Sequence, residues 1–380
     1  MKKAYNENWV ENLHIQQTAS AWLSKNLLTQ EQFEQVKNVF PEQFYRPGIF
    51  VKIGLFFFAM IACSFFAGFI SLFFLSSGSE AGFSFLSLIC AFCFAFFLEY
   101  LIKNKGLFHS GVDNALLYAA VFGAMIPVFL VFENASVWLY CIVALAILVP
   151  VILRYADLLA VVIAFGVLFT LLANLMMMFP LGKALLPFSV MILSAVIYVT
   201  ARKSKSLYYQ DCRKVLEVLS LFTFYLGGNY FIVREGNALM NDFNLPVSPQ
   251  ISFAPLFYFF TIIIPLAYIV NGLRKHDRIL FIIGLLALGF SIFTYRSYFS
   301  QLTPSQELAV AGALLLLIAW AAIRYLHTPK HGLCDEPDGR RKLANLEAIL
   351  VAQHLGQTPQ ENGIEFGGGN FGGGGAGEVY

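Results

Sequence analysis

The stretch FYLGGNYF at 224–231 holds the residue types best suited to form a binding site within a mainly apolar run. Gly227 and Gly228 loosen a helix, and an unwound turn at membrane depth exposes backbone carbonyls to an ion or a solute. Asn229 adds an amide that both donates and accepts hydrogen bonds. These three residues are therefore our candidates for a substrate-binding site.

The same residues fit a second interpretation in which they only pack. Small residues let two membrane helices approach closely, and an asparagine between them bonds to a neighbouring helix. Asn174, in LANLMMMFP, is another amide within an apolar run, and it is the candidate partner of Asn229. The sequence leaves both interpretations open, and Asn174 joins the three candidate site residues.

Motifs for catalysis are missing. We find no nucleotide-binding glycine loop, no HExxH zinc pair and no GxSxG nucleophile elbow. The CAFC motif at 90–93 has redox spacing, but it falls inside an apolar run, where small thiols fill space. We predict no catalytic residue, no metal, no cofactor and no disulfide, and we expect that the protein is not an enzyme.

Ionisable side chains within membrane segments are functional candidates by default, and this chain has few of them. Glu99 precedes Lys103 by four residues, and Glu217 follows Arg213 by four. That spacing predicts ordinary ion pairs on one helix face. No predicted span has an acidic residue at its midpoint, which argues against a carboxylate proton relay.

The elements that carry these residues follow from composition. Of 380 residues 58% are hydrophobic, only 13% are charged, and 40 are Phe. Several uncharged runs are close to the length of about 20 residues that a helix needs to cross a bilayer. A helix is the expected structure there, because it satisfies all its backbone hydrogen bonds within the segment. We predict an all-α fold, a polytopic membrane helix bundle of about ten transmembrane helices. The predicted spans are 50–75, 82–102, 114–132, 136–153, 157–179, 184–201, 214–233, 252–272, 279–296 and 307–325.

Basic residues orient this bundle. They concentrate in alternate loops, on the side that also carries both chain ends: Lys103, Lys105, Arg154, Arg202, Lys203, Lys205, Arg213, Lys214, Arg274, Lys275 and Arg278. The opposite loops carry only Lys183, Arg234 and Arg296. Because cytoplasmic loops are enriched in Lys and Arg, both termini are predicted to be cytoplasmic.

The predicted organisation has four parts. Residues 1–48 form a cytosolic amphipathic helix pair, in which Thr29 and Gln32 have the spacing of a capping box. The transmembrane bundle takes 49–326, and a cytosolic linker with an amphipathic helix takes 327–356. Residues 357–380 are a disordered Gly-rich tail. The helix pair is either a docking module or a cover lying against the bundle.

Two segments carry a family resemblance. LLTQEQFEQV followed by RPGIFVKIGLFFF, together with the run at 118–169, resembles a bacterial family of multi-spanning membrane proteins known as a domain of unknown function. The resemblance implies a cytosolic helix pair before a polytopic bundle in the bacterial inner membrane, and it supplies no activity. The ending FGGGNFGGGGAG is similar to the Gly-rich tails of TPM-type membrane proteins.

Two functions remain as hypotheses. The first is a non-catalytic membrane scaffold that reaches protein partners through the N-terminal helix pair and the C-terminal tail. The alternative is a ten-helix permease-like transporter of a small solute, since ten spans with both ends inside match a five-plus-five inverted repeat. The lipid bilayer is the expected partner in both cases, and no nucleic acid is expected.

Overall fold

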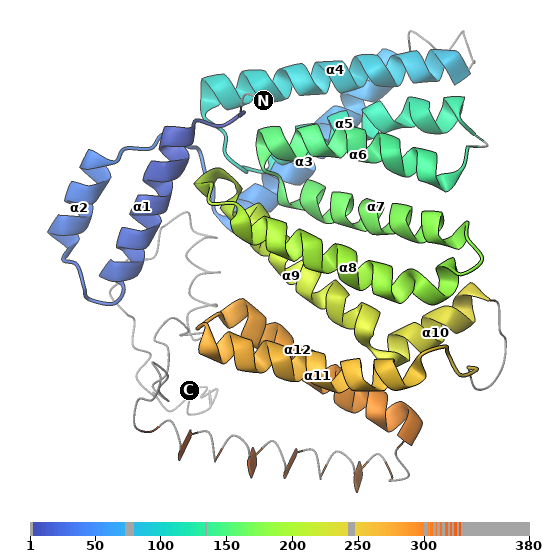
Figure 1. Ribbon diagram of the computed structural model, residues 1–380. Helices are drawn as coiled ribbons and strands as arrows, with labels where there is room; N and C mark the ends of the chain where they lie inside the picture. Colours follow the sequence, from blue (N-terminus) through green and yellow to red (C-terminus); the bar gives the residue numbers. More distant parts are fainter. Residues whose placement is uncertain are drawn as a thin grey trace, which may run out of the picture.

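A computed structural model describes residues 3–72, 80–133, 135–241 and 248–299, with scattered positions between 303 and 327. Within these ranges the fold is all-α, as predicted, and twelve α-helices follow one another along the chain (Figure 1). The predicted tenth span at 307–325 lies mostly outside the described residues. The C-terminal amphipathic helix and the Gly-rich tail lie wholly outside them.

The N-terminal helix pair consists of α1 (Glu7–Leu23) and α2 (Gln30–Val39), which lie side by side at one end of the molecule (Figure 1). The capping box at the start of α2 is confirmed. The Thr29 hydroxyl accepts from the Gln32 backbone N–H at 3.3 Å, and the Gln32 side chain accepts from the Thr29 N–H at 2.9 Å. These two bonds satisfy donors that a helix start leaves free.

The described part of the chain contains 8 helices long and apolar enough to cross a bilayer, or 9 if the bent pair of α9 and α10 counts as one span. Their positions match the first nine predicted spans. The helices are α3 (Ile49–Ser71), α4 (Glu80–Lys105), α5 (Val112–Val131), α6 (Val137–Tyr155), α7 (Leu158–Met177), α8 (Gly182–Lys203), α9 (Gln210–Gly228), α10 (Tyr230–Met240), α11 (Ala254–Arg274) and α12 (Arg278–Phe299).

Successive membrane helices run in opposite directions, so the bundle has two distinct ends (Figure 1). We call the N-terminal helix pair, α1 and α2, the hairpin. The end of the bundle beside it is where α3, α5, α7 and α9 begin and where α4, α6, α8 and α11 end. We call this the hairpin end. It gathers the basic loops whose charges predicted the orientation, at 103–105, 154, 202–214 and 274–278.

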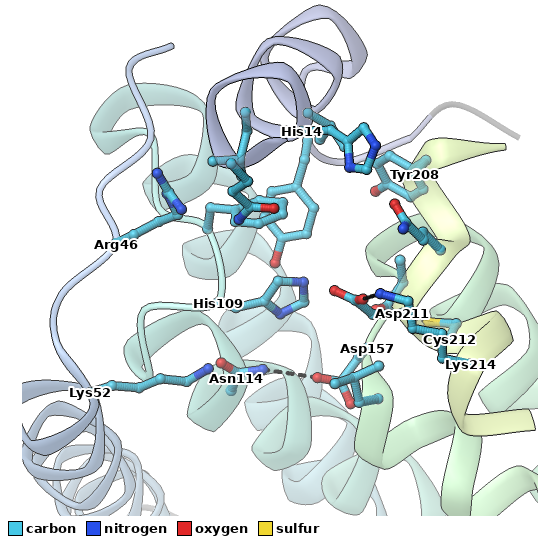
Figure 2. Close-up of a pocket in the computed structure, with 18 of the residues that line it drawn as sticks. His14, Arg46, Lys52, His109, Asn114, Asp157, Tyr208, Asp211, Cys212 and Lys214 are labelled. Carbon is cyan, nitrogen blue, oxygen red and sulfur yellow. Dashed lines mark hydrogen bonds and ion pairs between the residues drawn. The ribbon is translucent and has the colours of Figure 1, made fainter. Parts of the chain in front are cut away.

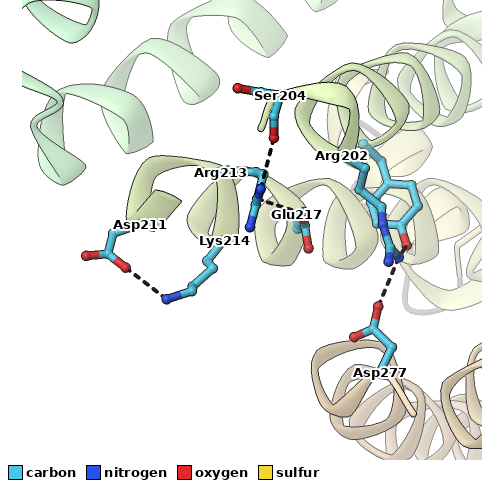
Figure 3. A network of polar contacts seen from close by, with 8 residues as sticks. Arg202, Ser204, Asp211, Arg213, Lys214, Glu217 and Asp277 are labelled. Atoms are coloured by element: carbon cyan, nitrogen blue, oxygen red, sulfur yellow. Dashed lines mark hydrogen bonds and ion pairs between the residues drawn. The ribbon is translucent and has the colours of Figure 1, made fainter. Parts of the chain in front are cut away.

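Ion pairs link helices at the hairpin end. Arg202 on α8 reaches Asp277, just before α12, at 2.9 Å (Figure 3). Arg213 and Glu217 form the predicted pair within α9 at 3.5 Å, and Arg213 also donates to the Ser204 carbonyl at 2.9 Å. The prediction for Glu99 is wrong. Its carboxylate binds Arg154 of α6 at 2.6 Å and accepts from the Tyr155 hydroxyl, while Lys103 is exposed and has no ion pair among the described residues.

Candidate functional site

The predicted interruption near residue 227 exists, and Asn229 is the residue that makes it. Helix α9 ends at Gly228, α10 begins at Tyr230, and the two axes differ by 74°. Asn229 itself is extended, with φ −81° and ψ 126°. Its side-chain oxygen caps α10 by accepting from the N–H groups of Phe231 at 3.0 Å and Ile232 at 3.3 Å. An asparagine at this position therefore ends one helix and starts the next.

A buried set of hydroxyls satisfies the broken turn. The Asn229 side chain is 0% exposed and donates to the Tyr225 hydroxyl at 2.8 Å and to Thr294 Oγ1 at 3.0 Å. The Tyr230 N–H donates to Thr261 Oγ1 at 2.9 Å. Ser291 shares a 2.8 Å hydrogen bond with Tyr225 and donates to the Thr261 carbonyl at 2.6 Å. Helices α9, α11 and α12 thus supply partners for the polar groups that the break exposes.

The two glycines allow close packing. An added Cβ at Gly227 would lie 3.0 Å from the Met191 side chain on α8, and one at Gly228 would lie 2.6 Å from Ile264 on α11. Asn174, on α7, is not among the partners of Asn229, and its side-chain oxygen has no hydrogen bond within the described residues. Three of the four candidate site residues thus lie together at the break, and Asn174 is not hydrogen-bonded to them. The contacts of the two glycines and the paired Asn229 side chain favour packing at this point, and a substrate site there stays a prediction.

The hairpin end holds a second polar site, which centres on two buried carboxylates. Asp113 lies in the first turn of α5 and is 1% exposed. One of its oxygens accepts from the Ser110 N–H at 2.8 Å and the Ser110 hydroxyl at 3.0 Å. The other accepts from the Tyr5 hydroxyl at 3.0 Å. The pKa of Tyr5 is raised well above its usual value, mainly by burial and next by the charge of Asp113. The Tyr5 hydroxyl therefore keeps its proton and remains a donor.

Asp157 is the second of these carboxylates and is 2% exposed. It caps α7 by accepting from the Ala160 N–H at 2.8 Å, after a tight turn in which Ala156 is left-handed with φ 49°. It also accepts from the Asn114 amide at 2.9 Å and the Tyr118 hydroxyl at 3.0 Å. Within the described residues neither carboxylate forms an ion pair. Hydrogen bonds and the positive ends of α5 and α7 hold both charges.

A close backbone approach positions this region. Gly111 has φ 102°, and a Cβ there would lie 2.2 Å from the Lys52 carbonyl oxygen, so only glycine fits between the starts of α3 and α5. The chain after α2 also pairs with the loop between α4 and α5, because the Tyr45 N–H donates to the Gly106 carbonyl at 2.8 Å. These contacts fix Lys52 and His109 in place relative to the two carboxylates.

A cavity of about 1330 Å³ lies between α1 and the first turns of α3, α5, α7 and α9. Figure 2 shows Arg46 and Lys52 on one side of it, Asp211 and Lys214 on the other, and His109 between them. Its volume exceeds the about 300–1,000 Å³ of sites for drug-sized ligands. The hairpin end is therefore hollow beneath the hairpin.

The charges of this cavity are unequal. Its basic lining residues are Lys25, Arg46, Lys52 and Lys214, and its acidic ones are Asp157 and Asp211. The His109 ring lies tilted against the Tyr5 ring with centroids 5.2 Å apart, and burial lowers the pKa of His109, so its imidazole is neutral at neutral pH. Four basic side chains against two acidic ones leave the lining with a small surplus of positive charge. The starts of α5, α7 and α9 already hold Asp113, Asp157 and Asp211, so among these four helices only the start of α3 adds to that surplus.

The polar groups of the cavity differ in whether they have partners. Lys214 pairs with Asp211 at 3.0 Å and Arg46 with Glu42 at 2.8 Å, whereas Lys25 and Lys52 have no ion pair within the described residues. Of these two, Lys25 is exposed and Lys52 is partly buried. The side-chain oxygen of Asn114 is buried without a hydrogen bond. An unpaired buried acceptor costs about 1–3 kcal/mol, so this oxygen suits a ligand that brings a donor. In the described part of the chain, no three His, Cys, Asp and Glu side chains gather as a metal site.

This cavity was not predicted from the sequence. Asp113 and Asp157 lie at helix starts, whereas ionisable residues at the middle of a span are the usual sign of a functional site. The available signal was Asp113 following the SG pair, and Asp157 between two apolar runs, each positioned to cap a helix.

The fold and these sites define a multi-spanning helical membrane protein. No protein-family model, no curated protein and no solved structure matches the chain. The family resemblance of the first 170 or so residues therefore stays a prediction, and the function is argued from geometry alone.

Proposed function

We propose that the protein is a non-catalytic membrane scaffold whose N-terminal hairpin presents a fixed surface to protein partners. The observation that carries this proposal is the way the hairpin is attached. The Ala4 N–H donates to the Arg154 carbonyl at 3.0 Å, Tyr5 bonds Asp113, and Tyr45 bonds Gly106. Three contacts from both flanks of the hairpin hold it against the bundle, so it is not a loosely tethered arm.

The outer helix of the hairpin is the proposed contact surface. None of its residues is buried, and it packs on α1. Large apolar side chains on and beside it are open to solvent: Val39 is 68% exposed and Leu27 67%. Apolar groups displayed on a fixed element at the membrane face are suited to a protein partner.

A photo-crosslinking amino acid placed at Val39 in the full chain tests the proposal. We expect discrete crosslinks to a second protein, and the same substitution at Phe65, a lipid-facing position that is 76% exposed, serves as the control. Removal of residues 357–380 should leave insertion and these crosslinks unchanged if the hairpin surface alone recruits the partner. A Val39 pattern identical to the Phe65 pattern would refute the proposal.

The proposed function also includes the orientation of the protein in its membrane. We infer a multi-pass protein of the bacterial inner membrane with both termini and the hairpin in the cytoplasm, supported by the basic loops at the hairpin end. Reporter fusions after Lys105, Lys205 and Lys275 are expected to report the cytoplasm, and a fusion after Asn241 the opposite side. One reversed reporter would mean that a span is miscounted.

A permease-like transporter of a small solute is the second candidate, and one observation favours it. The α9–α10 break lies within an apolar span, and discontinuous helices form the substrate and ion sites of many transporters. The polar groups at this break are already paired with one another, so transport would need them to separate. The stability of a variant that lacks the Asn229 side chain distinguishes the two functions.

A further inference from the structure

The cavity at the hairpin end continues onto the lipid-facing surface of the bundle. Phe57 of α3 lines the cavity, and its side chain is 62% exposed. Leu158 and Leu159 of α7 also line the cavity and are 42% and 44% exposed. These three side chains lie both on the wall of the cavity and on the lipid-facing surface, so the cavity opens toward the lipid. A ligand with apolar chains can therefore reach this cavity from within the membrane, without crossing the hairpin.

The depth of the positive charge fits the same ligand. Lys52 is the fourth residue of α3, and Lys214 lies in the second turn of α9, so both ammonium groups lie near the polar ends of their spans. Apolar side chains of α3, such as Ile53 and Phe57, follow Lys52 toward the membrane interior. Positive charge at headgroup level above apolar walls complements a phospholipid with a negative headgroup.

Asn114 supplies the third element of the site. It is 9% exposed, lines the cavity, and donates its N–H to Asp157, while its oxygen is left without a donor. A headgroup hydroxyl would satisfy that oxygen. An acidic headgroup with hydroxyls fits this set better than choline, which has no N–H or O–H to donate.

We propose that the cavity beneath the hairpin binds one anionic phospholipid with a hydroxyl-bearing headgroup, of the phosphatidylglycerol type. The phosphate lies toward Lys52 and the start of α3, a headgroup hydroxyl donates to Asn114, and the acyl chains pass Phe57 and Leu158 into the bilayer. This lipid site goes beyond the scaffold proposal and does not depend on a protein partner.

The test is native mass spectrometry of the full chain in detergent, titrated separately with phosphatidylglycerol, phosphatidylethanolamine and phosphatidylcholine. We expect a saturable single adduct with phosphatidylglycerol that binds more tightly than the other two. Lys52→Gln should weaken it about fivefold, because a basic residue near anionic lipid contributes about 1 kcal/mol. Lys103→Gln is the matched control, since Lys103 is exposed at the same end and does not line the cavity.

Three outcomes would overturn the proposal. The first is equal binding of the three lipids, or equal binding by the Lys52 and Lys103 variants when both show the wild-type melting temperature. The second is equally tight binding of water-soluble glycerophosphoglycerol, which would assign the site to a free phosphate compound. The third is lipid binding that appears only after removal of residues 357–380, which would mean that this chain's own tail fills the cavity.

Discussion

Replacing Asp113 with alanine is expected to detach the hairpin and to lower the free energy of unfolding by about 3–5 kcal/mol. The change removes the acceptor for the Ser110 N–H, the Ser110 hydroxyl and the Tyr5 hydroxyl, all in a buried setting. Each buried donor left unpaired costs about 1–3 kcal/mol, and water entering from the adjacent cavity offsets part of the sum. The loss falls on the contact that ties the N-terminal segment to α5.

Two measurements on the purified full chain check this expectation. Thermal unfolding in detergent gives the stability change, and limited trypsin digestion at Lys25 and Lys37 reports whether the hairpin is held. Asp211→Ala is the matched control, because the Asp211 side chain is 74% exposed and its one ion pair within the described residues is with Lys214. Such surface pairs contribute about 0–1 kcal/mol. Unchanged digestion of the Asp113 variant would show that Ala4 and Tyr45 hold the hairpin without it.

Detachment of the hairpin also connects the two proposals. Helix α1 of the hairpin forms one wall of the cavity, to which it contributes His14. Helix α2 of the hairpin carries the exposed surface proposed for the protein partner. The Asp113 variant should therefore lose both the Val39 crosslinks and the preference for phosphatidylglycerol. Loss of one without the other would show that the cavity wall and the partner surface act independently.

The helical architecture was predictable because local physics determines it. A run such as 53–71 has no alternative to a helix in lipid, since its backbone groups have no other partners. The capping box of Thr29 is likewise a short-range pattern, complete within four residues. Both are confirmed because neither depends on what another segment does.

The site was not predictable for the opposite reason. Tyr5 and Asp113 are 108 positions apart, and Asn114 and Asp157 are 43 apart. Glu99 illustrates the same limit, since its partner Arg154 belongs to another helix and the nearer Lys103 stays in solvent. Spacing along the chain predicts pairs within a helix, whereas packing decides pairs between helices.

The α9–α10 break lies between these cases. The residues GGN marked its position, but the partners of Asn229 did not follow from the sequence. Tyr225, Ser291 and Thr294 are single hydroxyls within apolar helices, and Thr294 lies 65 residues from Asn229. Only the packing of α12 against α9 shows that they serve one junction.

Replacing Asn229 with alanine is the second change with a large expected effect, a loss of about 3–5 kcal/mol of stability. The variant loses the cap of α10, which contributes about 0.5–2 kcal/mol. It also removes the donor and acceptor that Tyr225 and Thr294 share, at a fully buried point within the membrane. Asn271→Ala is the matched control, because that amide is exposed and bonds only the Ala267 carbonyl of its own helix.

The Asn229 variant also decides between a junction and a transport site, since the two make opposite demands on this residue. A structural cap contributes to the folded state at all times, so its loss lowers the thermal midpoint in detergent and the amount of protein retained in the membrane. A residue that binds a solute must instead separate from Tyr225 and Thr294 during each cycle, and natural sites of this kind cost stability. A variant that accumulates normally and melts at or above the wild-type temperature would therefore contradict the packed junction and favour the permease. The fully paired amide, with both glycines in close contact with α8 and α11, leads us to expect the loss.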